Sequence, residues 1–153
     1  MTSSSATTQS MSPVLQLSVF LQNQVGALLS LVRLLNEHKI EVLGFSVQDS
    51  VELTLVRLVV TAPEDAGAVF SEKGLAYASR NIVVVELGEG VHDLGHALSA
   101  LLAAEINIHH SYPLLVRPSD KPLLALYLDD PEVGAESLGK SGFKVLSQGD
   151  LSR

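Results

Sequence analysis

The side chains best suited to chemistry in this 153-residue chain include two asparagines, each in an unusual local context. Asn23 stands in a QNQVG loop that ends in Gly26, and Asn107 stands between two isoleucines. An asparagine amide can both donate and accept hydrogen bonds, and a glycine lets a ligand approach the backbone because it has no Cβ. These positions are therefore candidates for binding a small polar molecule.

Each of these positions also has a purely structural interpretation. Asn23 can turn or cap the chain, and Gly26 can relieve a strained turn. Asparagine is disfavoured within strands, but Asn107 can still be an exposed residue of an edge strand. The residue types alone leave both interpretations open.

Histidines form a second group, because four of the five fall between positions 92 and 110. His92 and His96 are four residues apart, so they can share a helix face and form a metal pair. His109 and His110 follow a predicted helix of roughly 18 Å, which places them near its far end. One metal site built from all four is not expected, and surface histidines are the default interpretation.

Catalytic motifs are missing from the sequence. It has no cysteine, and it contains no G-x-S-x-G, P-loop or H-E-x-x-H pattern. Asp129 and Asp130 are adjacent at the end of a predicted strand, so they point to opposite faces and make a poor acid–base pair. We expect them to form the turn before Pro131, and we do not expect an enzyme.

Composition favours a folded, acidic protein. Hydrophobic residues make up 46% and charged residues 18%, with a net charge of -7. The basic residues are scattered, which argues against nucleic acid and against a membrane surface as partner. No apolar run approaches the roughly 20 residues of a membrane-spanning helix. Residues 1–13 are rich in serine and threonine and predict a disordered tail, and the lack of cysteine fits a cytoplasmic protein.

The rest of the chain reads as an internal repeat, with residues 14–80 as one module and residues 81–153 as another. Leu28 and Leu94 lie 66 residues apart, and Pro63 and Pro131 lie 68 apart. The two extra residues fall in a predicted loop, where insertions are tolerated. The expected strands of the first module are residues 14–21, 40–48, 52–61 and 75–80, and those of the second are 82–87, 106–112, 123–128 and 143–148.

Helices are predicted between these strands from apolar residues at helical spacing. Each module then has the order strand–helix–strand–strand–helix–strand, which can fold as an antiparallel four-stranded sheet with both helices on one face. The expected class is therefore α+β. The helix stripes are Leu28, Leu31, Val32 and Leu35 in the first module, and Leu94, Ala97, Leu98 and Leu101 in the second.

These features together resemble the ACT domain, a regulatory module of many enzymes of amino-acid metabolism. The resemblance rests on the loop and helix NQVGALLSLVRLLNEHKIEV in the first module, and on VHDLGHALSALLAAEINI in the second. It implies two ferredoxin-like βαββαβ modules in tandem. It also implies an amino-acid site that pairs the loop of one module with the second strand of another.

Carried over to this sequence, the resemblance implies a set of ligand-binding residues. The family's loop asparagine and glycine fall on Asn23 and Gly26, whereas valine stands where proline is usual and His92 departs from the pattern. The strand asparagine falls on Asn107 in the second module, but the first module has Glu41 there. The implied ligand-binding residues are Asn23, Gln24, Val25, Gly26, Ala27, Leu28, Asn107 and Ile108.

We therefore expect a non-catalytic regulatory protein that binds an amino acid or a similar small molecule and needs no cofactor. The alternative is an interaction subunit that modulates a partner enzyme, in the manner of the acetolactate synthase small subunit. A homodimer is expected because exposed sheet edges invite pairing.

Overall fold

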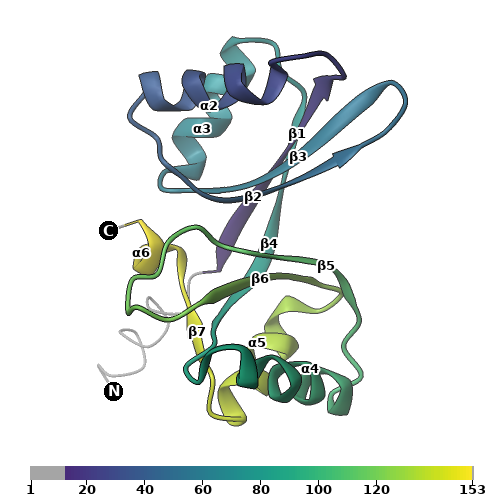
Figure 1. Cartoon of the computed structure of the whole chain (residues 1–153), viewed down its shortest axis with the longest axis vertical. Coiled ribbons are helices and arrows are strands. Elements are labelled where there is room, and N and C mark those ends of the chain that lie inside the picture. The colour runs from purple at the N-terminus through teal and green to yellow at the C-terminus, as the bar shows by residue number, and fades with distance from the viewer. Residues whose placement is uncertain (1–12, 153) are drawn as a thin grey trace. The chain divides into compact units, whose positions relative to one another are not determined.

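A computed structural model describes residues 13–152, and the chain divides into two compact units, residues 15–80 and residues 81–151 (Figure 1). The tail predicted over residues 1–13 lies, except for Pro13, outside the described residues. Both units are mixed α/β structures with antiparallel strand pairs.

The first unit contains three complete strands and two helices. Strand β3 (Leu53–Val60) lies between β1 (Val14–Gln22) and β2 (Val42–Asp49), and it is antiparallel to both. Helix α2 (Ala27–Glu37) follows β1, and helix α3 (Pro63–Glu72) follows β3. The chain then enters β4 (Tyr77–Glu86), whose beginning completes the order strand–helix–strand–strand–helix–strand.

The core of the first unit follows from alternation along its strands. Side chains of a strand point alternately to its two faces, and one face of β1 and β3 packs with the buried stripe of α2. Leu31 and Leu35 of that stripe are buried, together with Phe70 of α3. The strand residues of this core are Leu17, Val19, Leu21, Val56, Leu58 and Val60.

The second unit repeats the order of elements. The rest of β4 is followed by a 3₁₀ turn η1 (Gly90–His92) and helix α4 (Asp93–Ala103). Strand β6 (Leu123–Leu128) lies between β4 and β5 (Ile108–Pro113), and β7 (Lys144–Leu146) pairs with the other side of β4. Helix α5 (Pro131–Lys140) precedes β7, and a short helix α6 (Gln148–Leu151) ends the described chain.

Fine details of the backbone recur in the two units at the offsets seen in the sequence. The turn after α2 has Lys39 at φ 60°, and the turn after α4 has Glu105 at φ 59°. Each of the next strands has a register shift near its start, after Val42 in β2 and after Ile108 in β5. The two units thus share turns and irregularities as well as an order of elements.

A reciprocal hydrogen-bonded pair closes the hairpin of each unit in the same way. The Glu41 amide donates to Thr61 Oγ1 at 3.0 Å, and the Thr61 amide donates to the Glu41 carbonyl at 3.1 Å. In the second unit, the Asn107 amide donates to Asp129 Oδ1 and the Asp129 amide donates to the Asn107 carbonyl, both at 3.2 Å. The amides of Glu41 and Asn107 occupy matching positions, and each donates to a side chain: a threonine hydroxyl in the first unit and an aspartate carboxylate in the second.

Three expectations about these elements need correction. The strands predicted at 75–80 and 82–87 form one continuous strand, β4. The stretch 143–148 forms only the three-residue β7 before the chain turns into α6. In α4 only Ala97 and Leu101 of the predicted stripe are buried, whereas Leu94 and Leu98 remain partly exposed.

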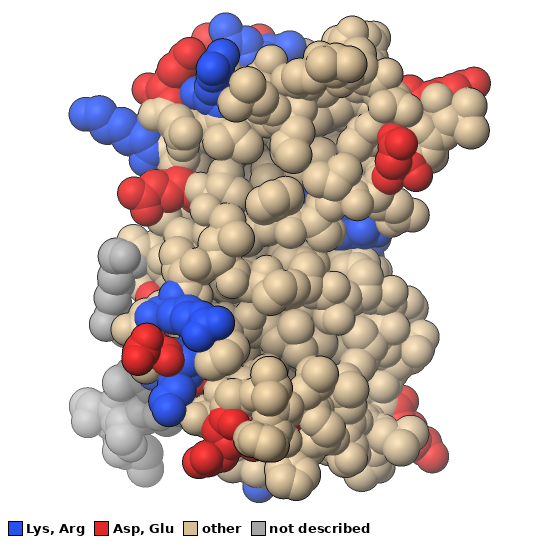
Figure 2. Space-filling model, viewed as in Figure 1, with Lys and Arg blue, Asp and Glu red and all other residues tan. Residues whose placement is uncertain are grey.

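The charged surface agrees with the scattered pattern of basic residues in the sequence. Figure 2 shows lysine and arginine in separate small groups on the face in view, and not in one continuous stripe. Among the helices of residues 13–152, none is both long enough and apolar enough to span a membrane.

Candidate functional site

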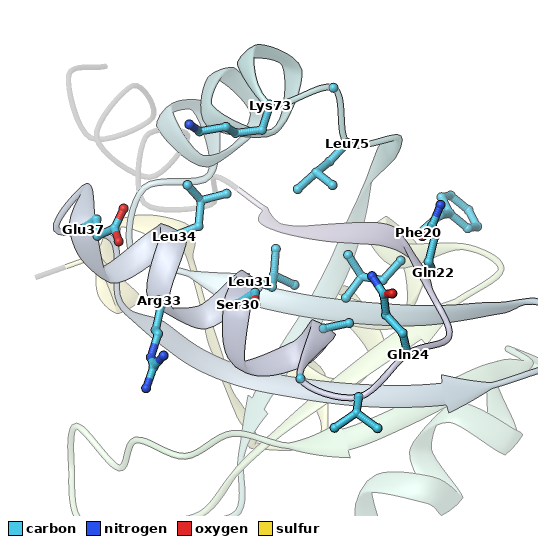
Figure 3. Close-up of a pocket in the computed structure, with 15 residues that line it drawn as sticks. Phe20, Gln22, Gln24, Ser30, Leu31, Arg33, Leu34, Glu37, Lys73 and Leu75 are labelled. Atoms are coloured by element: carbon cyan, nitrogen blue, oxygen red, sulfur yellow. The ribbon is translucent and has the colours of Figure 1, made fainter.

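The first unit contains an open cleft of about 770 Å³ beside α2 (Figure 3). The end of β1, the following loop, one side of α2 and the segment after α3 form its walls. The lining residues are Phe20, Leu21, Gln22, Gln24, Val25, Gly26, Ala27, Ser30, Leu31, Arg33, Leu34, Glu37, Lys73, Gly74 and Leu75.

Both apolar and polar side chains line this cleft. Leu31 and Leu34 of α2 and Leu75 face one another across it in Figure 3. The amide side chain of Gln24 lies near the mouth formed by the loop, and Lys73 lies on the opposite wall. The cleft therefore offers both apolar and polar contacts to a small molecule.

The loop between β1 and α2 supplies no side-chain cap to the start of the helix, although the Ala27 amide donates to the Gln24 carbonyl at 3.3 Å. Gly26 is the N-cap residue in the left-handed region, at φ 84°, and no side chain caps the helix. The first turn of α2 contains no acidic residue, and the Gly26 carbonyl accepts the Ser30 amide at 2.9 Å. Free backbone amides at a helix N-terminus attract a carboxylate, and the helix dipole strengthens that attraction.

Four of the predicted loop residues line the cleft, and two do not. Gln24, Val25, Gly26 and Ala27 are lining residues, whereas Leu28 is half-buried against the core of the unit. Asn23 Nδ2 donates to the Ser50 carbonyl at 3.1 Å, in the turn between β2 and β3. That bond supports the structural interpretation of Asn23, in which its amide holds the turn in place.

The two predicted residues of the second unit line neither the cleft beside α2 nor a second cleft beside α4. Asn107 precedes β5 and is exposed, and its backbone closes the hairpin with Asp129. Ile108 is half-buried and packs on the core of the second unit. A ligand contact at Asn107 stays a prediction.

The second unit has a matching cleft of about 620 Å³ beside α4. It lies at the end of β4, along one side of α4 and next to the segment after α5, so the same elements of the repeat form it. Its lining residues are Glu86, Gly88, Glu89, Asp93, His96, Ser99, Ala100, Ser141, Gly142, Phe143 and Lys144.

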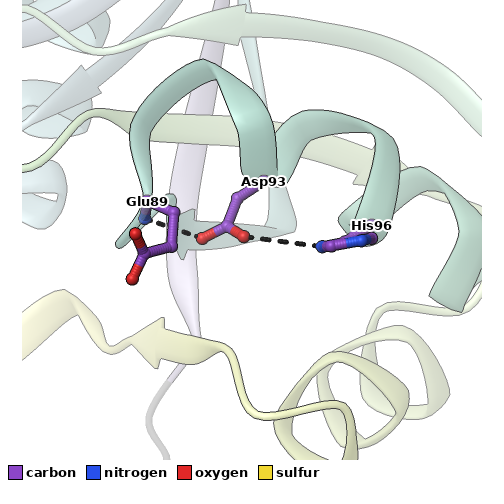
Figure 4. Close-up of polar contacts among 3 residues, drawn as sticks. All are labelled: Glu89, Asp93 and His96. Atoms are coloured by element: carbon purple, nitrogen blue, oxygen red, sulfur yellow. Dashed lines mark hydrogen bonds and ion pairs between the residues drawn. The ribbon is translucent and has the colours of Figure 1, made fainter.

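A carboxylate of the chain itself stands at the helix start in this second cleft. Asp93 Oδ2 accepts the Glu89 amide at 2.8 Å, and Asp93 Oδ1 lies 3.7 Å from His96 Nδ1 (Figure 4). The Asp93 side chain is only 15% exposed, whereas His96 is largely in solvent, as its position on the helix predicts. The first turn of α4 therefore contains a carboxylate, whereas the first turn of α2 contains none.

His109 and His110 belong to an aromatic cluster. The rings of His109 and His110 lie 4.8 and 4.9 Å from the ring of Tyr127. Within residues 13–152, no group of three or more histidine or acidic side chains is arranged to hold a metal ion. His92 ends the η1 turn before α4.

Sequence reasoning missed most of the polar lining of both clefts. Arg33, Glu37 and Lys73 are separated along the chain and belong to no local motif. The repeat offset was the one signal in the sequence that relates the two linings. It matches Lys73 and Ala27 of the first cleft with Ser141 and Asp93 of the second.

The fold and the repeated cleft define a class of protein built from paired α/β modules. The chain matches the family described as "ACT domain pair" over residues 12–153. It therefore belongs to the ACT domain pair family, a family of regulatory modules, and no catalytic family is indicated.

Solved structures show the same fold at low sequence identity. Protein BT0572 from Bacteroides thetaiotaomicron has a TM-score of 0.83 and 19% identity, with 92% of this chain and 96% of that chain covered. The regulatory subunit of aspartate kinase from Thermus thermophilus, in a ligand-free form, has a TM-score of 0.62 and 14% identity, with coverages of 87% and 95%.

A third structure is that of the aspartokinase alpha and beta subunits, with a TM-score of 0.56 and 14% identity. It covers 86% of this chain and 97% of that chain. No curated protein matches the sequence.

Proposed function

We propose that this chain is a non-catalytic regulatory protein that binds an amino acid in the cleft beside α2. The observation that carries the proposal is the uncapped start of α2, which opens into the cleft at Gly26. The loop residues proposed for contact are Gln24, Val25, Gly26 and Ala27.

The cleft offers a partner for each part of an amino acid. The first-turn amides of α2 suit the carboxylate, because that helix end carries the positive side of the dipole. The side-chain carbonyls of Gln22 and Gln24 can accept from the ammonium group. Leu31, Leu34 and Leu75 suit an aliphatic or aromatic side chain.

Asn107 remains a second proposed contact. Its backbone is used in the hairpin closure, but its side chain is exposed and takes no part in those bonds. Ile108 follows it at the start of β5. If Asn107→Ala leaves the affinity for the identified ligand unchanged, this contact is wrong and the cleft beside α2 is unaffected.

A second candidate function is regulation of a partner enzyme. It is favoured by the likeness of the fold to a structure described as a regulatory subunit of aspartate kinase. On this proposal the chain changes the activity of an enzyme of amino-acid metabolism, with or without a ligand of its own. Co-purification with such an enzyme, together with the absence of any amino-acid effect, would favour this alternative.

The experiment that tests the proposal is a thermal-shift screen of the purified chain against the twenty amino acids. A ligand that binds only the folded state raises the melting temperature, by an amount that grows with ligand concentration. Calorimetry then gives the affinity of each hit. No shift with any amino acid, at concentrations up to the millimolar range, would contradict amino-acid binding.

A matched pair of glycine variants locates the site. Gly26→Ala strains a left-handed residue in the cleft, and Gly90→Ala strains a left-handed residue of η1 at φ 69°. A Cβ meets no atom within 4 Å at either position, so the two changes are sterically alike. We expect Gly26→Ala to weaken binding at least tenfold and Gly90→Ala to leave it unchanged. Equal effects would place the ligand elsewhere.

A further inference from the structure

Two leucines that lie outside the loop from Gln24 to Ala27 line the cleft beside α2. Leu34 lies on α2, and Leu75 lies in the segment between α3 and β4. Both are half-buried, and both pack against the core of the first unit. Their side chains face the space beside Leu31 in Figure 3. An apolar group that enters the cleft would therefore lie between them.

The second unit has side chains of different size at the same two positions. The repeat offset carries Leu34 onto Ala100 and Leu75 onto Phe143. Ala100 and Phe143 both line the second cleft, and both are half-buried against the core of their unit. A pair of leucines in one unit is thus replaced by one smaller and one larger residue in the other.

The backbone at the second of these positions is the same in the two units. The Leu75 amide donates to the Phe70 carbonyl at 2.9 Å, and the Phe143 amide donates to the Leu138 carbonyl at 3.0 Å. These bonds match at the repeat offset of 68 residues. The difference between the two clefts at this point therefore lies in the side chains.

We infer that Leu34 and Leu75 set the size of the ligand side chain that the cleft beside α2 accepts, so that a branched aliphatic side chain fits better than an aromatic ring. The inference rests on the proposed function, because it requires an amino acid in this cleft. In the second cleft, the ring of Phe143 accompanies an alanine on the helix. A ligand ring in the first cleft would likewise need the room that Leu34 occupies.

The charged end of the cleft limits the ligand in a second way. Glu37 and Lys73 lie at the end of the cleft away from Gln24 in Figure 3. A large ring that extends past Leu34 would remove water from these charged groups without offering them hydrogen bonds, which costs free energy. A side chain of the size of valine or leucine stays among the apolar residues.

Calorimetry of the intact chain with L-valine, L-leucine, L-isoleucine and L-phenylalanine tests the inference. The wild type should bind at least one aliphatic amino acid roughly tenfold or more tightly than phenylalanine, because a misfit of one methylene group in an apolar pocket changes discrimination by roughly 10- to 200-fold. Leu34→Ala should reduce this preference by at least roughly tenfold, since it removes an aliphatic contact and makes room for the ring.

A double variant and a control sharpen the test. Leu34→Ala combined with Leu75→Phe reproduces the residue pair of the second unit, so the new ring should fill the added space and cancel the gain for phenylalanine. Leu29→Ala is the control, because Leu29 lies on the same helix and does not line the cleft. It should keep the wild-type preference. Partial unfolding of a variant lowers both apparent affinities equally and leaves their ratio unchanged.

The possible failures can be told apart. If no amino acid of the thermal-shift screen binds, the proposed function fails and this inference fails with it. If other amino acids bind but none of the three aliphatic ones does, or if phenylalanine binds the wild type as tightly as they do, the inference alone is wrong. The same holds if Leu34→Ala keeps the wild-type preference.

Discussion

The cleft beside α2 and the cleft beside α4 occupy matching places in the repeat, but their linings carry opposite charges. The first is lined by Arg33 and Lys73 and by a single carboxylate, Glu37. The second is lined by three carboxylates with one lysine; its charged residues are Glu86, Glu89, Asp93 and Lys144. Because the elements are the same, the difference arises from side chains alone.

The start of the helix shows the difference most clearly. At the repeat offset, Gly26 corresponds to His92 and Ala27 to Asp93. No side chain caps either helix start, but the glycine is left-handed, whereas His92 is right-handed at φ -66° and is followed by Asp93, whose carboxylate accepts the Glu89 amide. On the proposed function, a ligand carboxylate would bind at the start of α2, whereas in the second cleft it would meet the carboxylate of Asp93.

The largest effect on stability is expected when a glycine of the second unit is replaced by the alanine that stands at the matching position of the first unit. Gly134 of α5 corresponds to Ala66 of α3, and a methyl at position 134 would overlap Cδ1 of the buried Leu128. Overpacking costs about 1–3 kcal/mol, and alanine regains only about 0.5–1 kcal/mol as a helix former. We expect Gly134→Ala to lower the free energy of unfolding in urea by roughly 1–2 kcal/mol.

The reverse change is the control for that prediction. Ala66 is fully buried, so Ala66→Gly removes a packed methyl and a helix-favouring residue. Both variants should therefore be less stable than the wild type. A stabilised Gly134→Ala would show that Leu128 can move aside without strain.

An effect on stability of similar size is expected at Gly26. Gly26→Ala places a side chain in the left-handed region, which costs about 1–2 kcal/mol for a residue other than glycine. His92→Gly, at the matching position, should change stability by less than half as much, because His92 already adopts a right-handed conformation. Urea unfolding of both variants measures the difference, and equal losses would contradict the proposed role of backbone conformation.

A smaller effect is expected at the N-caps of α3 and α5. Asp130 Oδ1 accepts the Val133 amide at 3.1 Å, whereas Ala62 at the matching position offers no cap. The two residues have similar backbone angles, φ -136° and φ -137°. Asp130→Ala should lose about 1 kcal/mol, and Ala62→Asp should gain part of that amount. A destabilised Ala62→Asp would show that packing of Ala62 against the core matters more than the cap.

The smallest effect on stability is expected when an ion pair of α5 is removed. The matching positions of α3 hold no such pair. Lys140 Nζ lies 2.9 Å from Glu136 Oε1, and its hydrogen bond and charge lower the pKa of that glutamate below its ordinary value. Because the pKa of Glu136 is lower in the folded state than in the unfolded state, the ion pair makes a small contribution to the free energy of unfolding. That contribution is present above the pKa of the unfolded state and is lost as pH falls through the pKa of the folded state. Titration followed by NMR should show the pKa of Glu136 rising in Lys140→Met.

Periodicity was enough to predict the order of elements and most of both cores. Leu31 and Leu35 of α2 and Ala97 and Leu101 of α4 fall at helical spacing, and they are buried. The same spacing also included Leu94 and Leu98, which stay partly exposed. An apolar residue at the right interval shows which face of a helix is hydrophobic, but it does not show how far the sheet beneath extends.

Strand boundaries were harder to predict for a local reason. The split between residues 75–80 and 82–87 followed the repeat, yet the backbone of β4 continues through Arg80 and Asn81 without a turn. The candidate site was likewise predicted only in part. The loop residues from Gln24 to Ala27 could be found from the family pattern, whereas Arg33 and Lys73 join the cleft only because α2 and α3 pack on one core.

The sequence by itself predicted the repeated order of elements and the glycine before α2, because periodic patterns and backbone preferences act over a few neighbouring residues. Only the tertiary structure decided which polar side chains share a cleft, and that Asp93 stands as an anion at the start of α4. It also decided that Leu94, Leu98 and Leu102 remain uncovered. These properties depend on distances between residues far apart in the chain, which are set by packing and leave no local pattern.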